Sequence, residues 1–289
     1  MLRSRGRRAV AAAAALLGLA TAVVVAQSSG PTRSHAADRS LTVATWNMCG
    51  VRQWNCADTG SRAVKQRELR RLATRAGGRV IFLQEACTGD VEAVRRALGP
   101  SWHTAFRLYR VGDRAGHVDT VPCAGAGQGS AGIAILAGYP LSSVTPVPAP
   151  QPTVGLRRGI LCASVTAHQV RLCTAHLSPA GSDRAHPGWE FRDDQLKALV
   201  AAVPARRTVY GGDLNVNPPG GGNSASWVWP SAPYSSHREC DGPPGSARST
   251  HVSGHKLDYL FTGLPKTRCA LRDTGASDHL ALVMRVRTD

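Results

Sequence analysis

The feature that most constrains the fold is a set of short apolar segments, each adjoining a polar residue able to bind a metal ion or transfer a proton. Residues 41–46, 80–83, 170–175 and 208–210 have the length and composition of strands. If the strand ends meet at one edge of the sheets, their polar residues form a single pocket. These residues are Asn47, Glu85, His176, Asp213 with Asn215, Asp258, Asp278 and His279.

The remaining periodic segments are helices and strands in mixed order. The patterns predict helices over 62–76, 91–98 and 190–203, and further strands over 131–136, 158–164, 257–261 and 280–286. This order favours an α+β fold in which helices cover sheets. The Pro/Gly/Ser-rich stretches 146–152 and 218–244 are predicted to be surface loops. Since no repeat or internal linker is evident, residues 41–289 are predicted to form a single domain.

The N-terminus has the pattern of an export signal. Four arginines precede an apolar run from Ala9 to Ala26, which predicts a signal over residues 1–26, or to 36 if the second small-residue site is cleaved. Residues 27–40 are polar and aperiodic, as in a disordered linker. We therefore expect a secreted protein, with membrane anchoring as the alternative if the signal is not cleaved.

Eight cysteines, all after the signal, favour disulfides in an oxidising compartment. A two-residue turn at Ala167-His168 would place Cys162 opposite Cys173 on paired strands, close enough to bridge. Cys49 with Cys56, Cys87 with Cys123 and Cys240 with Cys269 would complete the set, although sequence alone does not fix this connectivity. A cysteine metal site is the less favoured alternative, because no close Cys-x-x-Cys pair occurs.

The formal charge of the chain is +16, and five arginines precede Asp38 with no acid among them, so the remainder keeps about +11. Such a field attracts polyanions, although frequent arginine is also a coding bias. Against this basic background, the acids Glu85 and Asp278 offer hard oxygen ligands. These suit Mg²⁺, with Mn²⁺ or Ca²⁺ as alternatives, better than Zn²⁺. A metal ion beside paired histidines and carboxylates is an arrangement suited to phosphoester hydrolysis.

Taken together, these motifs resemble the endonuclease/exonuclease/phosphatase superfamily. They follow the family's order across residues 41–287, and their joint occurrence is far more specific than any one of them. The matching pieces are Thr45-Trp46-Asn47, Gln84-Glu85, Gly132–Leu136 with Tyr139-Pro140-Leu141, Ala175-His176-Leu177, Gly212–Asn215, Lys256–Tyr259 and Ser277-Asp278-His279.

The resemblance implies a four-layer α/β/β/α sandwich of the deoxyribonuclease I type, with the site at one edge. It implies Glu85 as the main metal ligand, supported by Asn47 and Asp278. His279, paired with Asp258, would activate water or bind the phosphate. Family members differ in which residue acts as the base, so Asp213 and His279 are alternative candidates for that role. The resemblance further implies that Asp213 and Asn215 orient the nucleophile and the phosphate, that His176 faces the phosphate or the leaving group, and that Arg157 or Arg158 contacts phosphate.

Two departures from secreted deoxyribonucleases stand out. The arginine that follows their glutamate is replaced here by Ala86-Cys87, and the Ser-Arg after their Ala-Ile-Leu strand by Ala137-Gly138. We predict a secreted, metal-dependent phosphodiesterase that hydrolyses nucleic acid, as an endonuclease on DNA. The alternatives are a sphingomyelinase-type phospholipase and an inositol-phosphate phosphatase. We expect a monomer with no stable protein partner.

Other conspicuous residues have an ordinary interpretation. Histidines without motif context, including His117, His251 and His255, are expected in surface or loop roles. Trp227 and Trp229 could stack on bases or form a lipid-facing loop, but such a pair more often packs a loop against the core.

Overall fold

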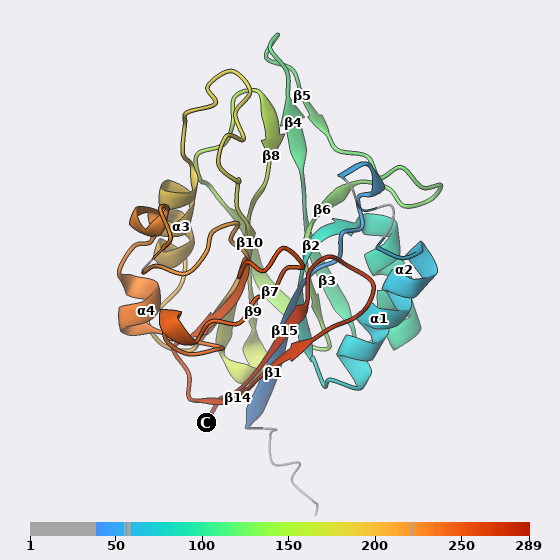
Figure 1. The fold of residues 1–289 in the computed structure, drawn as a ribbon. Helices are drawn as coiled ribbons and strands as arrows, with labels where there is room; N and C mark the ends of the chain where they lie inside the picture. Colours follow the sequence, from blue (N-terminus) through green and yellow to red (C-terminus); the bar gives the residue numbers. More distant parts are fainter. Residues whose placement is uncertain (1–38, 55, 57–58, 221) are drawn as a thin grey trace, which may run out of the picture. The chain divides into compact units, whose positions relative to one another are not determined.

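The computed structural model describes residues 39–289 except 55, 57, 58 and 221. Two six-stranded sheets lie face to face, and a small third sheet projects beyond them (Figure 1). In spatial order the first sheet contains β14 (Lys266–Arg272), β15 (Ala281–Arg287), β1 (Ser40–Asn47), β2 (Val80–Cys87), β6 (Ala131–Ala137) and β3 (His103–Leu108). The second contains β12 (Arg238–Glu239), β13 (Asp258–Thr262), β11 (Thr208–Asp213), β10 (Val170–His176), β9 (Gly159–Val165) and β7 (Leu141–Val147). The third contains β5 (Val118–Thr120), β4 (Arg110–Gly112) and β8 (Gly155–Arg157).

Helices cover the outer faces of both large sheets. Those on the first sheet are α1 (Arg62–Thr74) and α2 (Thr88–Leu98), and those on the second are α3 (Arg192–Ala201) and α4 (Ala232–Ser236) (Figure 1). Short 3₁₀ helices occupy Arg52–Trp54, Thr166–His168, Ser226–Val228 and Pro244–Ser246. Three buried apolar clusters fill the space between the sheets and the space beneath each helical layer. The predicted α/β/β/α sandwich is confirmed.

The helices occur where their periodicity predicts them, with shifted ends. The side chain of Ser61 caps α1 by accepting a hydrogen bond from the Val64 N–H, and the helix ends two residues before the predicted limit. The first turn of α2 begins three residues earlier than predicted. Glu190 lies just outside α3, because its carboxylate accepts the Phe191 and Arg192 N–H groups.

Several strands were not predicted, because their side chains give no long apolar run. These are the edge strands of the two large sheets, β3, β7, β12 and β14, and the three short strands of the third sheet. The β7 strand includes Pro146 and Val147, so the loop predicted over 146–152 is wrong at its start. Pro146 is tolerated there because an edge strand needs no N–H on its open side. The predicted 218–244 loop likewise contains α4 and β12. The first strand begins at Ser40, one residue before the predicted domain boundary.

All four predicted disulfides are present: Cys49–Cys56, Cys87–Cys123, Cys162–Cys173 and Cys240–Cys269. Cys162 does lie opposite Cys173, but the hairpin loop is longer than predicted. It holds a 3₁₀ turn and a left-handed Gln169 with φ of 51°. Four disulfides indicate an oxidising compartment. The predicted signal lies outside the described residues, and within those residues no helix is long and apolar enough to cross a bilayer.

Candidate active site

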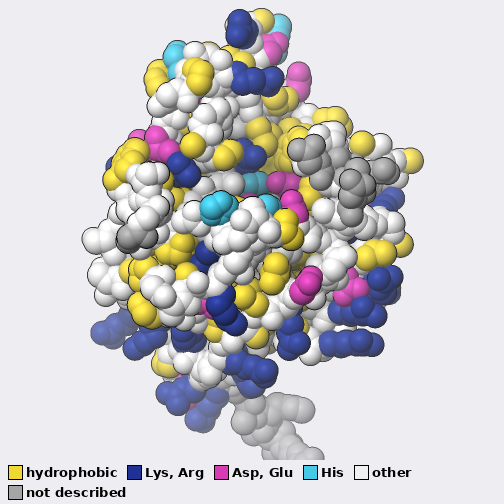
Figure 2. Space-filling model, in the orientation of Figure 1, with side chains coloured by type: hydrophobic (Ala, Val, Ile, Leu, Met, Phe, Trp, Pro, Cys, Tyr) yellow, Lys and Arg dark blue, Asp and Glu magenta, His cyan; other side chains and the backbone are white. Residues whose placement is uncertain are grey.

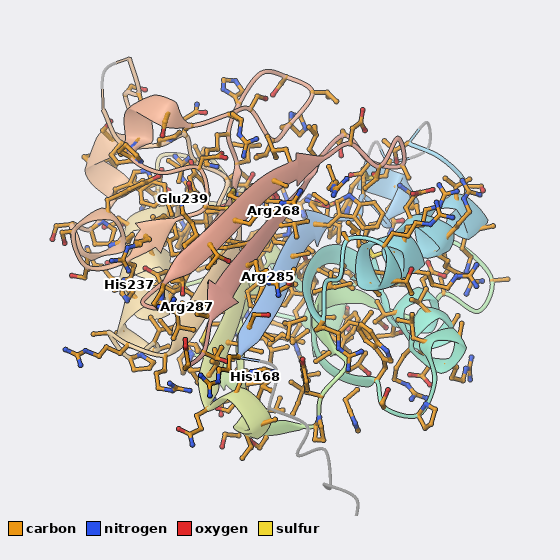
Figure 3. All side chains as sticks on the ribbon, turned by 90° about the horizontal axis from the view of Figure 1, so that it is seen from below. His168, His237, Glu239, Arg268, Arg285 and Arg287 are labelled. Atoms are coloured by element: carbon orange, nitrogen blue, oxygen red, sulfur yellow. A yellow bond between two sulfur atoms is a disulfide. The ribbon has the colours of Figure 1, made fainter. Side chains whose placement is uncertain are left out.

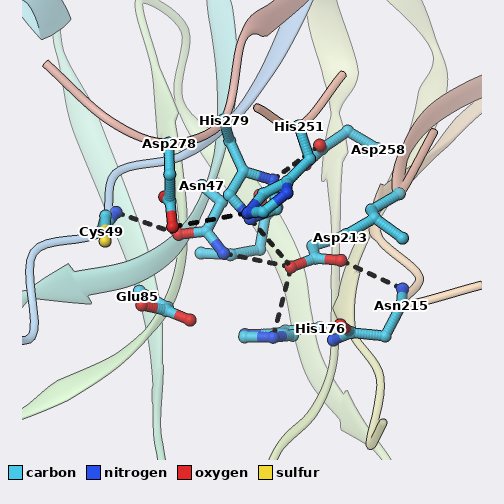
Figure 4. Close-up of polar contacts among 12 residues, drawn as sticks. Asn47, Cys49, Glu85, His176, Asp213, Asn215, His251, Asp258, Asp278 and His279 are labelled. Atoms are coloured by element: carbon cyan, nitrogen blue, oxygen red, sulfur yellow. Dashed lines mark hydrogen bonds and ion pairs between the residues drawn. The ribbon is translucent and has the colours of Figure 1, made fainter. Parts of the chain in front are cut away.

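The polar residues at the strand ends meet at one edge of the two large sheets (Figure 4). In the second sheet, strand pairing places His176 opposite Asp213, and Asp213 opposite Asp258. In the first sheet, β1 ends at Asn47, which pairs with Gln84 of β2. The strand register therefore aligns these residues in two rows, which meet where Asn47 contacts Asp213.

Two glycines allow the central strand of the second sheet to lie close to both neighbours. A Cβ on Gly211 would overlap the backbone carbonyl of Tyr259, and one on Gly212 would overlap that of Ala175. Gly212 also has a φ of 124°, which other residues rarely adopt. The glycine pair thus fixes the position of Asp213 at the strand end.

Asp213 lies at the centre of the cluster and is buried. Its Oδ2 accepts a hydrogen bond from Asn47 Nδ2 at 3.0 Å, and lies 3.4 Å from His176 Nε2 and 3.9 Å from His279 Nε2. Its Oδ1 accepts the Asn215 N–H at 3.0 Å. Burial raises the pKa of the Asp213 carboxyl to about 6, although the His279 charge opposes the change.

His279 is held through both its ring and its backbone. Its Nδ1 lies 2.8 Å from Asp258 Oδ2, its carbonyl accepts the Trp46 indole N–H, and its N–H donates to Ser277 Oγ at 3.0 Å. Burial alone would lower the pKa of His279, but the Asp258 carboxylate and two further aspartates raise it to about 10. His279 is therefore an imidazolium at neutral pH.

Asp258 uses its two carboxylate oxygens differently. Oδ2 pairs with His279, whereas Oδ1 is buried and has no hydrogen-bond partner among residues 39–289 as described. The backbone at this point is fixed by Thr250, whose Oγ1 accepts the N–H groups of Leu257 and Asp258 at 2.9 Å each. Asp258 is thus a rigid acceptor that orients the His279 ring.

A β-bulge determines the direction of Glu85. The pairing of β2 with β6 shifts register between Leu83 and Ala86, and Glu85 within the bulge has a left-handed φ of 48°. The Gly50 N–H donates to the Glu85 carbonyl at 2.9 Å, and the Glu85 N–H donates to Tyr109 Oη at 3.0 Å. Such a bulge redirects one side chain of a strand, and the Glu85 carboxylate faces the cluster (Figure 4). Burial raises its pKa to about 7, despite nearby Arg158.

His176 is a buried neutral imidazole. Burial, with the charges of Arg158 and His279, lowers its pKa well below the usual value. Arg158 Nε donates to His176 Nε2 at 3.0 Å. A guanidinium cannot accept a hydrogen bond. The ring proton of His176 is therefore on Nδ1, from which it is donated to Tyr109 Oη at 2.6 Å.

The sequence model of the endonuclease/exonuclease/phosphatase family matches residues 44–279. The chain belongs to this family. No curated protein matches the sequence closely enough to count as a relative. Solved structures with the same fold include an endonuclease/exonuclease/phosphatase from Beutenbergia cavernae, with a TM-score of 0.61, 22% identity, and coverage of 86% of this chain and 72% of that one. A second is the human Nocturnin catalytic domain, with a TM-score of 0.59, 16% identity, and coverage of 86% of this chain and 94% of that one. A third is an AP endonuclease from Archaeoglobus fulgidus, with a TM-score of 0.52, 16% identity, and coverage of 84% of this chain and 98% of that one.

Membership in the endonuclease/exonuclease/phosphatase family makes this protein a metal-dependent phosphoric ester hydrolase. The residues fit a divalent cation. Burial makes the ionised form of Glu85 costly and so raises its pKa, and a nearby cation would offset the cost of burying that charge. The carbonyl oxygen of Asn47 and the carboxylate of Asp278 border the same space (Figure 4). Cys49 and Cys56 also lie close to Glu85, but as a disulfide they supply no thiolate ligand.

The structure separates the two arginines that compete for a phosphate contact. Arg158 lies against His176, whereas Arg157 donates to the carbonyls of Pro152 (2.9 Å) and Thr153 (3.2 Å) in a loop. Asn215 reaches the cluster through its backbone, which adopts a left-handed φ of 52°.

Three further residues belong to the site, and sequence reasoning missed them. Tyr109 bridges Glu85 and His176. The His251 ring packs 4.6 Å from the ring of His279, and its Nε2 lies 3.5 Å from Asp278 Oδ2. The amine of buried Lys65 donates to backbone carbonyls, among them those of Met48 (2.9 Å) and Ala276 (2.7 Å). None of the three lies in a motif that signals it.

Proposed function

We propose that this protein is a secreted phosphodiesterase that uses a divalent metal ion to hydrolyse nucleic acid, acting as an endonuclease on DNA. The observation that carries the proposal is the buried Asp213 carboxylate, which lies between a neutral and a cationic histidine in a strongly basic molecule. In Figure 2, histidine and acidic side chains gather near the centre of the face shown, and arginine and lysine side chains surround its lower part.

The oxygen donors Glu85, Asn47 and Asp278 would hold the metal ion, and such donors favour Mg²⁺, with Mn²⁺ or Ca²⁺ as alternatives. Once bound, the ion would neutralise phosphate charge and stabilise the transition state. Lys65 fixes the backbone next to Asn47 and Asp278, since its amine bonds Met48 and Ala276. The ligand geometry therefore depends on the core beneath it as well as on the ligands.

Asp213 is the base in this mechanism. Its pKa of about 6 leaves the carboxylate ionised at neutral pH and basic enough to accept a proton from the attacking water. His279 suits proton donation better than this task, because the Asp258 and Asp213 carboxylates raise its pKa to about 10. The hydrogen bond from Asn47 holds the carboxylate in place during proton transfer.

His279 and Arg158 supply positive charge to the phosphate. The imidazolium of His279 is oriented by Asp258, so its Nε2–H faces the cluster and can donate to a phosphate oxygen. Arg158 is oriented by neutral His176 and faces the same space. Hydrogen bonds from cationic donors to phosphate are about twice as strong as neutral ones, and they stabilise charge that develops in the transition state.

A lipid substrate is less well supported than DNA. The candidate apolar loop reduces to Trp227, which is 64% exposed, because Val228 and Trp229 are buried in the core. The Trp229 indole N–H donates to the Asn217 carbonyl at 2.8 Å, which fixes the ring inside the fold. The one exposed indole of this loop is a small apolar surface for insertion into a membrane.

The test is a substrate panel of supercoiled plasmid, RNA, sphingomyelin and inositol phosphates, each with Mg²⁺ and with excess chelator. We expect nicking of the plasmid that is abolished by chelator and by His279→Ala, and retained by the matched control His117→Ala on an exposed loop. Faster hydrolysis of sphingomyelin or inositol phosphates than of plasmid would replace the proposal with one of the alternatives.

A further inference from the structure

Five arginines line a groove on the outer face of the first sheet, outside the catalytic cluster. The groove has a volume of about 320 Å³ and lies between the β14-β15-β1 part of the sheet and the end of α1. Figure 3 shows this region, with Arg268 and Arg285 labelled on β14 and β15. We call it the basic groove, and its arginines are Arg75, Arg79, Arg268, Arg272 and Arg285.

Strand pairing explains why these side chains share one face. Thr42 of β1 pairs with Arg285 of β15, and Arg285 pairs with Arg268 of β14. Paired residues point to the same side of a sheet, and alternation along β14 brings Arg272 to that side as well. Val283, two residues before Arg285, packs in the cluster beneath α1 and α2, which identifies this side as the outer one.

No acidic residue lines the basic groove, and none of its five arginines forms an ion pair within the described chain. Several exposed arginines on α1 and α2 are paired, as in Arg95 with Glu92 and Arg71 with Glu68. Arg79 is anchored at one wall, where its guanidinium donates to the Gly138 carbonyl at 2.7 Å. The groove therefore concentrates positive charge that the protein itself does not neutralise.

We infer that the basic groove binds a single strand of nucleic acid that extends beyond the scissile phosphate. The inference rests on the proposed function for the identity of the polymer. Arg272 pairs with Ala281, two residues after His279, so the groove starts near the catalytic edge. From there it runs along β14 to Arg268, and four residues of strand cover about 13 Å, long enough to contact successive phosphates of one strand.

A phosphate-bearing strand fits this groove better than a membrane surface does. The exposed large apolar residues of the described chain are Leu108, Val144, Trp189, Trp227 and Val252, and none of them lines the groove. Binding at a membrane surface requires apolar side chains that enter the lipid, whereas binding to a nucleic-acid backbone requires only cations spaced to meet its phosphates. Recessed cations also suit a single strand, which can follow a concave surface.

The test compares the double variant Arg268→Ser/Arg285→Ser with the control Arg67→Ser/Arg96→Ser, which removes equal charge from paired arginines on α1 and α2. The probe is a fluorescein-labelled 20-nucleotide single strand, titrated in excess chelator so that no cleavage occurs. The loss of two arginine–phosphate contacts should flatten the slope of the logarithm of the association constant against the logarithm of salt concentration by about 1.4. It should also weaken binding roughly 60-fold at 50 mM salt. The control should bind like the parent.

Cleavage then distinguishes this inference from the proposed function. With metal, bis(p-nitrophenyl) phosphate is too short to reach the groove, so the groove variant should hydrolyse it at the parental rate while KM rises for the 20-nucleotide strand. If the parent cleaves neither substrate, the proposed function fails, and the chelator titration still decides the inference. Equal affinity and salt slope in parent and groove variant would overturn the inference. So would tighter groove-dependent binding to anionic phospholipid vesicles than to the oligonucleotide.

Discussion

The Asp258→Asn substitution tests the central geometry of the site. An asparagine retains a carbonyl oxygen near His279 Nδ1, where the carboxylate lies 2.8 Å away, but it removes the negative charge. Hydrogen bonds to charged groups contribute roughly 1.5–3 kcal/mol. If the pair stabilises the cationic ring during the reaction, kcat should fall by roughly 10- to 150-fold.

The same substitution has a separate expected effect on stability. Oδ1 of Asp258 is buried without a hydrogen-bond partner in the described chain, so the new amide would bury an unpaired donor. Such a group costs roughly 1–3 kcal/mol. For a domain of this size, each kcal/mol shifts Tm by about 2–4 °C. We therefore expect a lower Tm in a variant that remains folded at the assay temperature.

The assay measures hydrolysis of bis(p-nitrophenyl) phosphate at saturating metal, together with thermal unfolding. The control is Asp119→Asn, which makes the same chemical change at an exposed position of β5. A kcat within twofold of the parent, in a variant with the predicted loss of Tm, would refute the assigned role of the Asp258–His279 pair.

Three further outcomes follow from the geometry. Tyr109→Phe removes the hydroxyl shared by Glu85 and His176, so a higher metal concentration should be needed for half-maximal activity, as a Mg²⁺ titration would show. Replacing Cys87 and Cys123 by alanine opens a 36-residue loop and should cost roughly 4 kcal/mol in denaturant unfolding. Burial alone would raise the pKa of Asp241, but its hydrogen bonds to Lys256 and Arg248 lower it. The stabilisation from these bonds is therefore present above about pH 4 and lost on acidification. Asp241→Asn should flatten the dependence of the unfolding free energy on pH.

The sequence predicts which polar residues meet in the cluster, because most of them lie at strand ends; Glu85 instead lies in the bulge within β2. To group Asn47, His176 and Asp213, one needs only to assume that the strand ends converge. The register of β10, β11 and β13 brings their ends together in this way. The four-layer sandwich and the Cys162–Cys173 pairing likewise depend on local periodicity and strand registration.

The supporting residues could not be predicted, since each acquires its role from a contact distant in sequence. Tyr109 follows β3 and reaches His176 across 67 positions. Lys65 has the sequence context of an exposed helical lysine, yet its amine is buried against the backbone next to the proposed metal ligands. Arg158 differs from Arg157 only in that it follows β8 rather than ending it, a boundary that sequence patterns rarely resolve.

These supporting contacts decide whether the motif residues can act. Glu85 adopts a left-handed backbone that costs of order 1–3 kcal/mol and persists only where its surroundings enforce it. The surroundings here are the Tyr109 hydroxyl and the Gly50 N–H, and Gly50 follows Cys49 of a seven-residue disulfide loop. We therefore expect a chain with every motif but without Tyr109 or this disulfide to lose the orientation of Glu85, the proposed main metal ligand, so the motifs alone do not ensure an active site.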